Sequence, residues 1–189
     1  VGFYNEDPET GKIVRTDQFE LDVDGELTIV EAAAGKARPA LILVNDDDLT
    51  YTKLRFDEKS LKFAAENLYR FDDALARSVI WLAFWDMTRD GELPAKQFIE
   101  TSLAALATEH ESTTFRYALA QVSTTAWHYT APADRAEVVE HVAAELFKLA
   151  QAAEAGSDEQ FQLITAYLDY GEPGDAAFEA NAKGLLDGS

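Results

Sequence analysis

Hydrophobic and polar residues alternate with a period of two over the first part of the chain. Phe19, Leu21 and Val23 alternate with acidic residues, which is the pattern of a half-buried strand. Asp24-Gly25 comes next and a second β-rich run follows it, so a hairpin with a tight turn is predicted over residues 19–30. The sequence thus predicts about five or six short strands, the others lying at residues 1–5, 12–16, 40–44 and 50–56.

The hydrophobic period becomes helical after residue 57. Asp72 or Asp73 can cap a helix, Gly91 is a stop signal, and Ser157 with Gln160 three residues later forms a capping box. Residues 79–85 are apolar on all sides, which predicts a helix buried over most of its surface, with Trp85 inside it. About seven helices are predicted, near residues 59–70, 73–89, 94–108, 112–128, 132–155, 157–170 and from about 175 onward.

The order of these elements predicts an α+β fold. A short N-terminal antiparallel β segment, residues 1–57, precedes an all-α bundle, residues 58–189, whose short loops favour antiparallel helical pairs. The pairs begin near residues 59, 94 and 133, a spacing typical of HEAT-like superhelical repeats, although no repeated residue signature accompanies it. No Ser/Gly-rich linker separates the two regions, so we expect them to pack directly.

Charge and cysteine content narrow the classes of function. The 189 residues hold 35 acidic and 16 basic side chains, a net charge of −19, which repels phosphate backbones and anionic lipid. We therefore expect no nucleic-acid partner and no membrane partner, and no apolar run approaches the roughly 18 residues that a membrane helix needs. The absence of cysteine excludes disulfides and thiolate zinc sites, and it fits a cytoplasmic location. The start at Val1 lacks the basic region of a signal peptide, and it is typical of a piece of a longer protein.

One segment imitates a catalytic zinc motif. His110-Glu111 begins like H-E-x-x-H, in which two histidines one helical turn apart bind Zn²⁺ and the glutamate activates water. Thr114 occupies the position of the second histidine, and the segment falls in a predicted loop. A zinc site is therefore not expected here. His141 and Glu145 have helical spacing, but two ligands make no site, and we expect them to form a solvated pair.

The acidic segments imitate cation sites. Residues 20–31 supply acidic side chains and a glycine at calcium-loop spacing, but an EF-hand needs flanking helices and here both flanks have the strand period. We expect a hairpin with solvated acidic residues instead; those that match are Glu20, Asp22, Asp24, Gly25 and Glu31. The run 46–48 is expected to be a solvated turn. Trp81 and Trp85 lie one helical turn apart and could stack on a ligand, but core packing is favoured by their apolar neighbours.

Catalytic machinery is otherwise absent from the sequence. There is no Gly-rich phosphate loop, nucleophile elbow or dinucleotide fingerprint, and the three histidines, at 110, 128 and 141, have no Ser–Asp partners in an obvious arrangement. We therefore predict no catalytic, cofactor-binding or metal-binding residue in this chain. From chemistry alone the sequence describes a helical scaffold with a β-rich start.

Two longer segments resemble a known family. Residues 41–57, L-I-L-V-N-D-D-D-L-T-Y-T-K-L-R-F-D, resemble the junction between the β-sandwich and helical domains of aminopeptidase N-type zinc metallopeptidases. Residues 73–95, D-A-L-A-R-S-V-I-W-L-A-F-W-D-M-T-R-D-G-E-L-P-A, resemble the first long helix of that helical domain. Their amino-acid sequence is most similar to the actinobacterial branch of the family. The tail from residue 156 resembles the later helices more loosely.

The resemblance implies a role for this chain within a larger enzyme. Such enzymes remove N-terminal amino acids from peptides with a zinc ion held by H-E-x-x-H and a distant Glu, and a G-x-M-E-N strand binds the substrate amine. Neither motif occurs here, so residues 1–57 would be the end of a β-sandwich and residues 58–189 an incomplete, non-catalytic helical domain. That domain would pack over the catalytic domain of the same chain and enclose the chamber for peptide substrates. A free-standing helical-repeat adaptor that binds partner proteins or peptides is the alternative. If residues 1–57 are the end of a β-sandwich, their strands lack a covering layer and would favour self-association.

Overall fold

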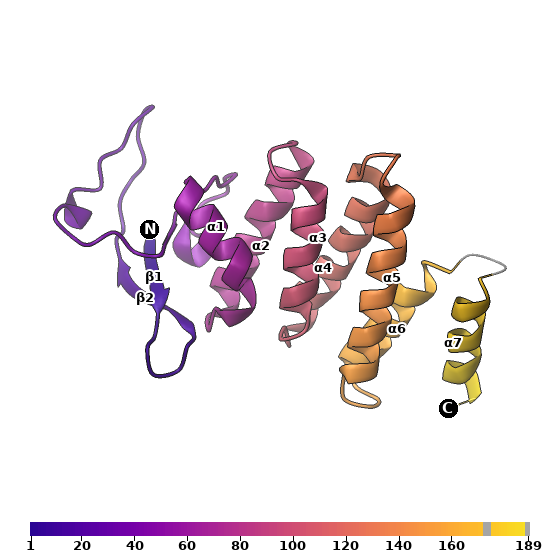
Figure 1. Cartoon of the computed structure of the whole chain (residues 1–189). Coiled ribbons are helices and arrows are strands. Elements are labelled where there is room, and N and C mark those ends of the chain that lie inside the picture. Colours follow the sequence, from indigo (N-terminus) through magenta and orange to yellow (C-terminus); the bar gives the residue numbers. More distant parts are fainter. Residues whose placement is uncertain (172–174, 188–189) are drawn as a thin grey trace. The chain divides into compact units, whose positions relative to one another are not determined.

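The computed structural model describes residues 1–171 and 175–187. Their contacts divide the chain into two compact units, Val1–Leu93 and Pro94–Ser189 (Figure 1). A small antiparallel sheet lies at the start of the first unit, and the other regular elements of the described residues are helices, so the predicted α+β class is confirmed. Assignment of residues 1–57 and 58–189 to two separate domains stays a prediction.

The sheet contains three strands in the order β2-β1-β3. β1 (Gly2–Glu6) lies in the centre and pairs antiparallel with both β2 (Ile13–Gln18) and β3 (Leu41–Leu43). The turn between β1 and β2 closes because the Asp7 carboxylate accepts hydrogen bonds from the backbone N–H groups of Glu9 and Thr10. The strands predicted at residues 1–5, 12–16 and 40–44 are thereby confirmed.

The core of the first unit lies between this sheet and the helices that follow it. Tyr4, Ile13, Leu41 and Leu43 are fully buried, and Ile42 is half-buried, so β3 is covered on one face more than on the other. The next helix, α1 (Glu58–Asn67), is joined to β3 through Ser60, whose hydroxyl accepts a 3.0 Å hydrogen bond from the Ile42 N–H. A 3₁₀ turn, η3 (Leu68–Arg70), ends this helical segment.

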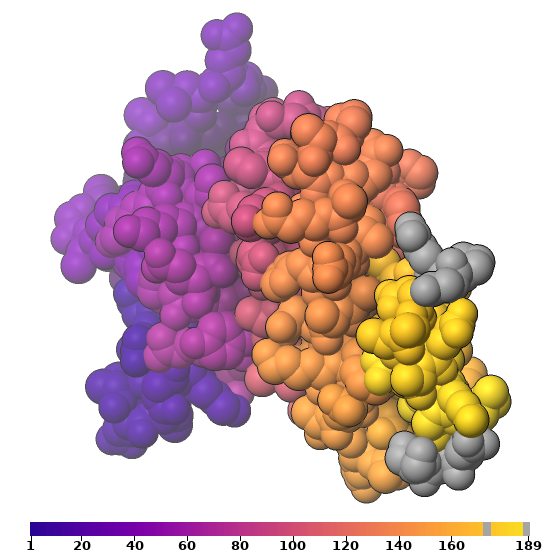
Figure 2. All heavy atoms as spheres, turned by 45° about the vertical axis from the view of Figure 1, so that its right-hand side comes forward, coloured from indigo at the N-terminus to yellow at the C-terminus, as the bar shows by residue number. Residues whose placement is uncertain are grey.

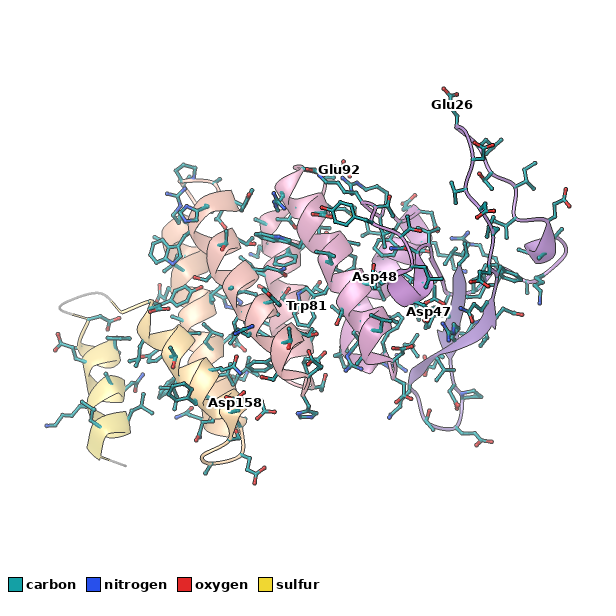
Figure 3. All side chains as sticks on the ribbon, turned by 180° about the vertical axis from the view of Figure 1, so that it is seen from behind. Glu26, Asp47, Asp48, Trp81, Glu92 and Asp158 are labelled. Carbon is teal, nitrogen blue, oxygen red and sulfur yellow. The ribbon has the colours of Figure 1, made fainter. Side chains whose placement is uncertain are left out.

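The predicted hairpin over residues 19–30 is wrong. This segment, the arm, contains no strand, and the side chains of Val23, Leu27 and Ile29 are 74–82% exposed. Only a local contact holds its tip, where Thr28 Oγ1 bonds with the backbone of Asp24, and Glu26 lies at the far end of the arm (Figure 3). The alternation of apolar and acidic residues is typical of a strand whose apolar face is covered by another layer of the protein. Nothing among the described residues supplies that layer, and an isolated hairpin is marginal in water.

The strand predicted at residues 50–56 is also wrong, so the described residues contain three strands and not five or six. Residues 51–57 form no regular structure, and two short 3₁₀ turns, η1 (Glu31–Ala33) and η2 (Asp46–Asp48), lie on either side of β3. β-branched and aromatic residues favour a strand only where a neighbouring strand is in reach. Here Lys53 and Arg55 instead hold the segment against Asp90 and Glu92, which lie just beyond the second helix.

The second helix, α2 (Ala74–Arg89), begins where the sequence predicts. The Asp73 side chain accepts hydrogen bonds from the N–H groups of Leu75 and Ala76, and Gly91 has a positive φ of 77° just beyond the end. Most of the apolar run 79–85 is buried, which confirms a largely enclosed helix. Trp81 is 3% exposed, but Trp85 is only half-buried, so the expectation that Trp85 lies inside the core is wrong.

The second unit consists of the remaining five helices, which bring the described chain to the seven predicted. α5 packs along α6, and α4 contacts both α3 and α6. The Ser157 side chain accepts a 3.1 Å hydrogen bond from the Gln160 N–H, as the capping box predicts. The last turn after α4 widens into a π-helical turn, η4. The elements are α3 (Ala95–Leu106), α4 (Ser112–Thr124), η4 (Thr125–Tyr129), α5 (Arg135–Ala152), α6 (Asp158–Leu168) and α7 (Ala176–Asp187).

Candidate functional site

The segment at His110, which resembles the start of a zinc-binding motif, forms a helix cap. The Glu111 carboxylate accepts a 2.7 Å hydrogen bond from the Thr114 N–H at the start of α4. Backbone hydrogen bonds to the carboxylate, that of Thr114 first, hold the pKa of Glu111 below its usual value, as a charged cap at a helix N-terminus requires. The His110 side chain is largely exposed and lies 3.8 Å from Glu159. Glu111 therefore organises a helix end and has no second histidine beside it.

The predicted pair of His141 and Glu145 is wrong. His141 Nε2 lies 3.0 Å from the Glu100 carboxylate on α3, and Glu145 pairs with Lys148 at 3.0 Å. Sequence spacing placed both residues on one helix face, but a carboxylate on a neighbouring helix is closer to the imidazole. Over the described part of the chain, no group of three or more His, Asp or Glu side chains is arranged to hold a metal ion.

The acidic run at residues 46–48 differs from the solvated turn expected. Asp46 is 3% exposed, and its carboxylate accepts a 2.7 Å hydrogen bond from the Tyr4 hydroxyl and a 2.8 Å bond from Arg15. Arg15 also bonds to Asp47 at 2.7 Å. Burial and the Asp46 hydrogen bond raise the pKa of Tyr4 far above its usual value of 10. This buried network joins all three strand regions, and no room for a Cβ remains at Gly2 beside Asp46.

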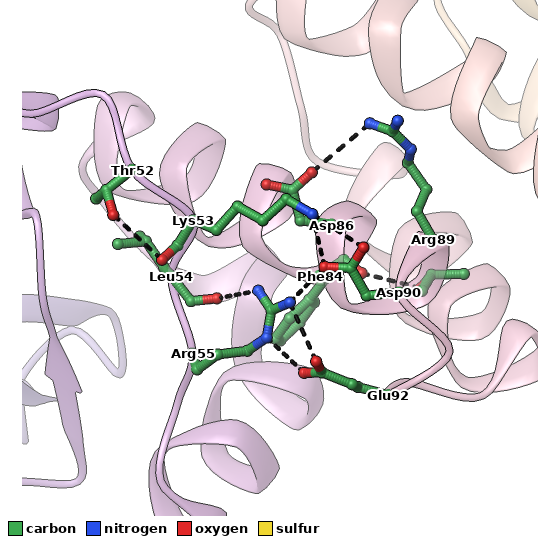
Figure 4. A network of polar contacts seen from close by, with 10 residues as sticks. Thr52, Lys53, Leu54, Arg55, Phe84, Asp86, Arg89, Asp90 and Glu92 are labelled. Atoms are coloured by element: carbon green, nitrogen blue, oxygen red, sulfur yellow. Dashed lines mark hydrogen bonds and ion pairs between the residues drawn. The ribbon is translucent and has the colours of Figure 1, made fainter.

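A second network, the clamp, fixes the segment before α1 to the end of α2 (Figure 4). Lys53 Nζ lies 2.7 Å from Asp90, and Arg55 bonds to both Asp90 and Glu92. The Lys53 hydrogen bond first, and then that of Arg55, lower the pKa of Asp90 below its usual value of 3.8. Alternate residues of an extended segment share a face, so Lys53 and Arg55 can face Asp90 and Glu92 together. This match of two basic with two acidic residues was visible in the sequence, but the predictions from periodicity missed it.

The second unit carries an aromatic groove of about 790 Å³ against α5. Ring contacts form its walls: Trp127 stacks on Tyr170 at 6.0 Å, and Tyr167 contacts both Phe147 (4.8 Å) and Phe178 (5.1 Å). In the space-filling view the surfaces of α5 (orange) and α7 (yellow) lie next to each other on one face (Figure 2). Further lining residues include Pro132, Arg135, Ala136, Val139, Glu140, Ala143, Lys148 and Asp175.

A groove of different chemistry lies between α4 and α6. This groove, here called the polar groove, has a volume of about 790 Å³, and its lining combines apolar residues with hydroxyl, amide and charged side chains. The apolar residues are Leu119, Ala120, Phe161 and Ala166, and the others include Ser112, Thr113, Arg116, Ser123, Asp158, Gln162 and Thr165. Asp158 accepts hydrogen bonds from Ser112 (3.1 Å) and Gln162 (2.6 Å), while Phe161 is 69% exposed at its side. Such a surface can bind a polar chain through hydrogen bonds.

Comparison with known proteins decides the family. The sequence model of the ERAP1-like C-terminal domain matches residues 41–189, most of the chain. The chain belongs to this family. It is also 41% identical, over 167 residues, to an aminopeptidase N of Streptomyces lividans, an alignment that covers 88% of this chain and 19% of the relative. The chain thus spans about a fifth of the length of that relative.

These matches confirm the resemblance read from residues 41–57 and 73–95. As a member of the ERAP1-like C-terminal domain family, the chain is a helical C-terminal region of the aminopeptidase N type. None of the helices in the described ranges is long and apolar enough to cross a membrane. The sequence reasoning missed the two grooves, because a groove depends on which helix faces meet and a single sequence does not record that.

Proposed function

We propose that this chain is the non-catalytic C-terminal region of a zinc aminopeptidase that removes N-terminal amino acids from peptides. The observation that carries the proposal is the family match over residues 41–189, together with the 41% identity to an aminopeptidase N. In this role the chain packs over the catalytic domain of the same parent polypeptide and encloses the substrate chamber. Enclosure excludes water from the reacting groups and restricts the length of peptide that enters.

The zinc ion of such an enzyme would lie elsewhere in the parent chain. A catalytic zinc takes three protein ligands and keeps one position open for water. The described residues do not fit that requirement, since His110 lies in the loop before α4, His128 in η4 and His141 in α5, and no group of three metal-binding side chains is found among them. This chain therefore contributes shape and binding surface, and no step of the hydrolysis.

The polar groove is the surface that we propose to face the chamber. Its hydroxyl and amide side chains can bond to the N–H and C=O groups of a peptide, which every peptide carries whatever its sequence. The net charge of −19 also attracts the positive N-terminus of a peptide.

Two further parts of the proposal concern location and assembly. A cysteine-free chain is compatible with the reducing cytoplasm. In isolation, this chain would self-associate through residues 1–57, because the arm exposes Val23, Leu27 and Ile29.

The reading frame upstream of Val1 tests the assignment directly. An H-E-x-x-H motif within the preceding few hundred codons supports the aminopeptidase assignment. A start codon just before Val1, with no such motif, overturns it in favour of a free-standing adaptor.

The chamber role is tested in the parent enzyme with bulky substitutions. Ala120→Trp places a large ring in the polar groove, and Ala177→Trp places the same ring in the aromatic groove as a matched control. We expect Ala120→Trp to slow hydrolysis of long peptides while leaving an alanyl anilide unaffected, and Ala177→Trp to change neither. Equal effects of both variants on both substrates would contradict the assignment of the polar groove.

A further inference from the structure

The dipeptide Asp-Gly occurs twice within the described residues, in contrasting surroundings. Asp24-Gly25 lies near the tip of the arm, and Asp90-Gly91 follows the last residue of α2. Both dipeptides are followed by Glu-Leu, so their local chemistry is closely matched. In Asp-Gly the backbone nitrogen of glycine can attack the side-chain carboxyl carbon of aspartate and close a succinimide ring, because glycine has no side chain to hinder the approach.

The reacting groups of Asp24-Gly25 are unrestrained by the described part of the chain. Both residues are exposed, and neither the Asp24 carboxylate nor the Gly25 N–H has a hydrogen-bond partner among the described residues. Gly25 has a positive φ of 68°, and the position of an added Cβ there faces open space. The Thr28 hydroxyl also donates a 3.0 Å hydrogen bond to the Asp24 carbonyl. That bond polarises the peptide group to which the Gly25 nitrogen belongs, so its N–H is easier to deprotonate.

The same two groups are held in place at Asp90-Gly91. The Gly91 N–H donates a 3.1 Å hydrogen bond to the Thr88 carbonyl. The Asp90 carboxylate is bound in the clamp by Lys53 and Arg55, whose hydrogen bonds lower its pKa below the usual value. Ring closure needs the neutral carboxylic acid, because its hydroxyl group has to leave as water. The clamp keeps the carboxylate ionised and the nitrogen stays engaged, so this dipeptide is protected.

We propose that Asp24-Gly25 is a site of spontaneous modification, at which aspartate is converted to isoaspartate. The Gly25 nitrogen bonds to the side-chain carboxyl carbon of Asp24, and the displaced hydroxyl group leaves with the amide proton as water. A water molecule then opens the succinimide. Attack at the side-chain carbonyl restores aspartate, whereas attack at the former backbone carbonyl gives isoaspartate. The mass of the chain is unchanged, the main chain becomes longer by a methylene group, and a free α-carboxylate appears beside Thr28.

The test follows both dipeptides in the same purified chain. The chain is incubated in dilute neutral buffer, so that self-association does not cover the arm, and samples are digested with a protease that cleaves before aspartate but not before isoaspartate. Liquid chromatography with mass spectrometry then measures peptides of unchanged mass that resist cleavage at residue 24 or 90. We expect isoaspartate to form at Asp90 at least about tenfold more slowly than at Asp24, because a held site reacts only in molecules that have opened locally.

Unfolding and substitution provide the controls. In urea the two sites should react at similar rates, since their flanking residues match and the clamp is lost. Asp24→Glu should abolish the resistant peptide, because the longer side chain forms no succinimide, and Thr28→Val should slow its formation. Absence of isoaspartate at residue 24, or equal rates at the two sites in the folded chain, overturns the proposal. A rate difference that persists in urea would trace it to the flanking sequence and not to the fold, and would also overturn it.

Discussion

The Tyr4 hydroxyl donates a 2.7 Å hydrogen bond to the buried carboxylate of Asp46, 42 residues further along the chain. Tyr4 lies in the central strand β1, and Asp46 follows the edge strand β3, so the bond ties the turn after β3 to the middle of the sheet. Both side chains are almost inaccessible to solvent. A buried carboxylate is tolerated only where donors satisfy it, and Tyr4 and Arg15 do so here.

Removal of the Tyr4 hydroxyl should destabilise the first unit. Tyr4→Phe leaves one oxygen of the buried Asp46 carboxylate without its donor, and we expect a loss of about 1–3 kcal/mol in the free energy of unfolding. Tyr51→Phe is the matched control, since Tyr51 is fully exposed, and it should change stability by less than about 0.5 kcal/mol. Urea unfolding of both variants measures the difference. Equal stabilities would show that the Tyr4 hydroxyl is not needed by Asp46.

The two tryptophans of α2 should differ in their contribution to stability. Trp81 is 3% exposed, so Trp81→Ala leaves a large void and should cost about 3–5 kcal/mol in the free energy of unfolding. Trp85 is half-buried, so part of its ring already contacts water and Trp85→Ala should cost about half as much. Urea unfolding compares the two variants. A larger loss of stability for Trp85→Ala than for Trp81→Ala would show that Trp85 lies in the core, as the sequence predicted.

The clamp should give stability a dependence on acid. The pKa of Asp90 is lowered in the folded chain, so its ionised form stabilises the fold above the usual value of 3.8, and this contribution is lost as the pH falls through the folded pKa. Asp90→Asn should therefore lower the thermal midpoint at pH 7, and the difference from the unmodified chain should vanish once the pH lies below the lowered pKa of Asp90. Glu66→Gln, at an exposed position of α1, should show no such trend. A difference that is the same at every pH would contradict the ionic role of the clamp, as would insensitivity to salt.

Self-association of the isolated chain should depend on the arm. Val23, Leu27 and Ile29 are exposed, and we expect dimers or larger species in light scattering at high concentration. Replacement of all three by threonine should restore a monomer, while Leu186→Thr, which changes an exposed leucine of α7, should not. A clean monomer of the unmodified chain at high concentration would rule out this contact.

The isolated chain should bind no catalytic zinc and cleave no aminoacyl substrate. Its three histidines lie on different elements, and Glu111 caps a helix. Dialysis against zinc, followed by metal analysis and an assay with a leucyl anilide, measures both properties. One tightly bound zinc per chain with hydrolysis that a chelator abolishes would place an active site within these residues and overturn the proposed function.

Sequence reasoning worked best where a signal is local. Asp73, Gly91 and Ser157 each act through atoms within three or four residues, so the helix ends were predicted closely. It failed over residues 19–30 and 50–56. These residues have β propensity or alternating polarity, but a strand also needs a neighbouring strand, and the sequence of one segment does not show whether such a neighbour exists. For the same reason the pairing of His141 with Glu100 could not be predicted from the helix that carries His141.

The sequence by itself determined the α+β class, about seven helices, the caps of two of them and the family, because periodicity, caps and family motifs are properties of short segments. Tertiary structure alone decided that Asp46 is buried against Tyr4, that Trp81 and not Trp85 enters the core, and that two grooves flank α6. These features depend on which side chains from distant segments meet. Contacts between distant segments determine burial, ion pairing and cavity shape. The pattern of residues along a single strand or helix does not encode these contacts.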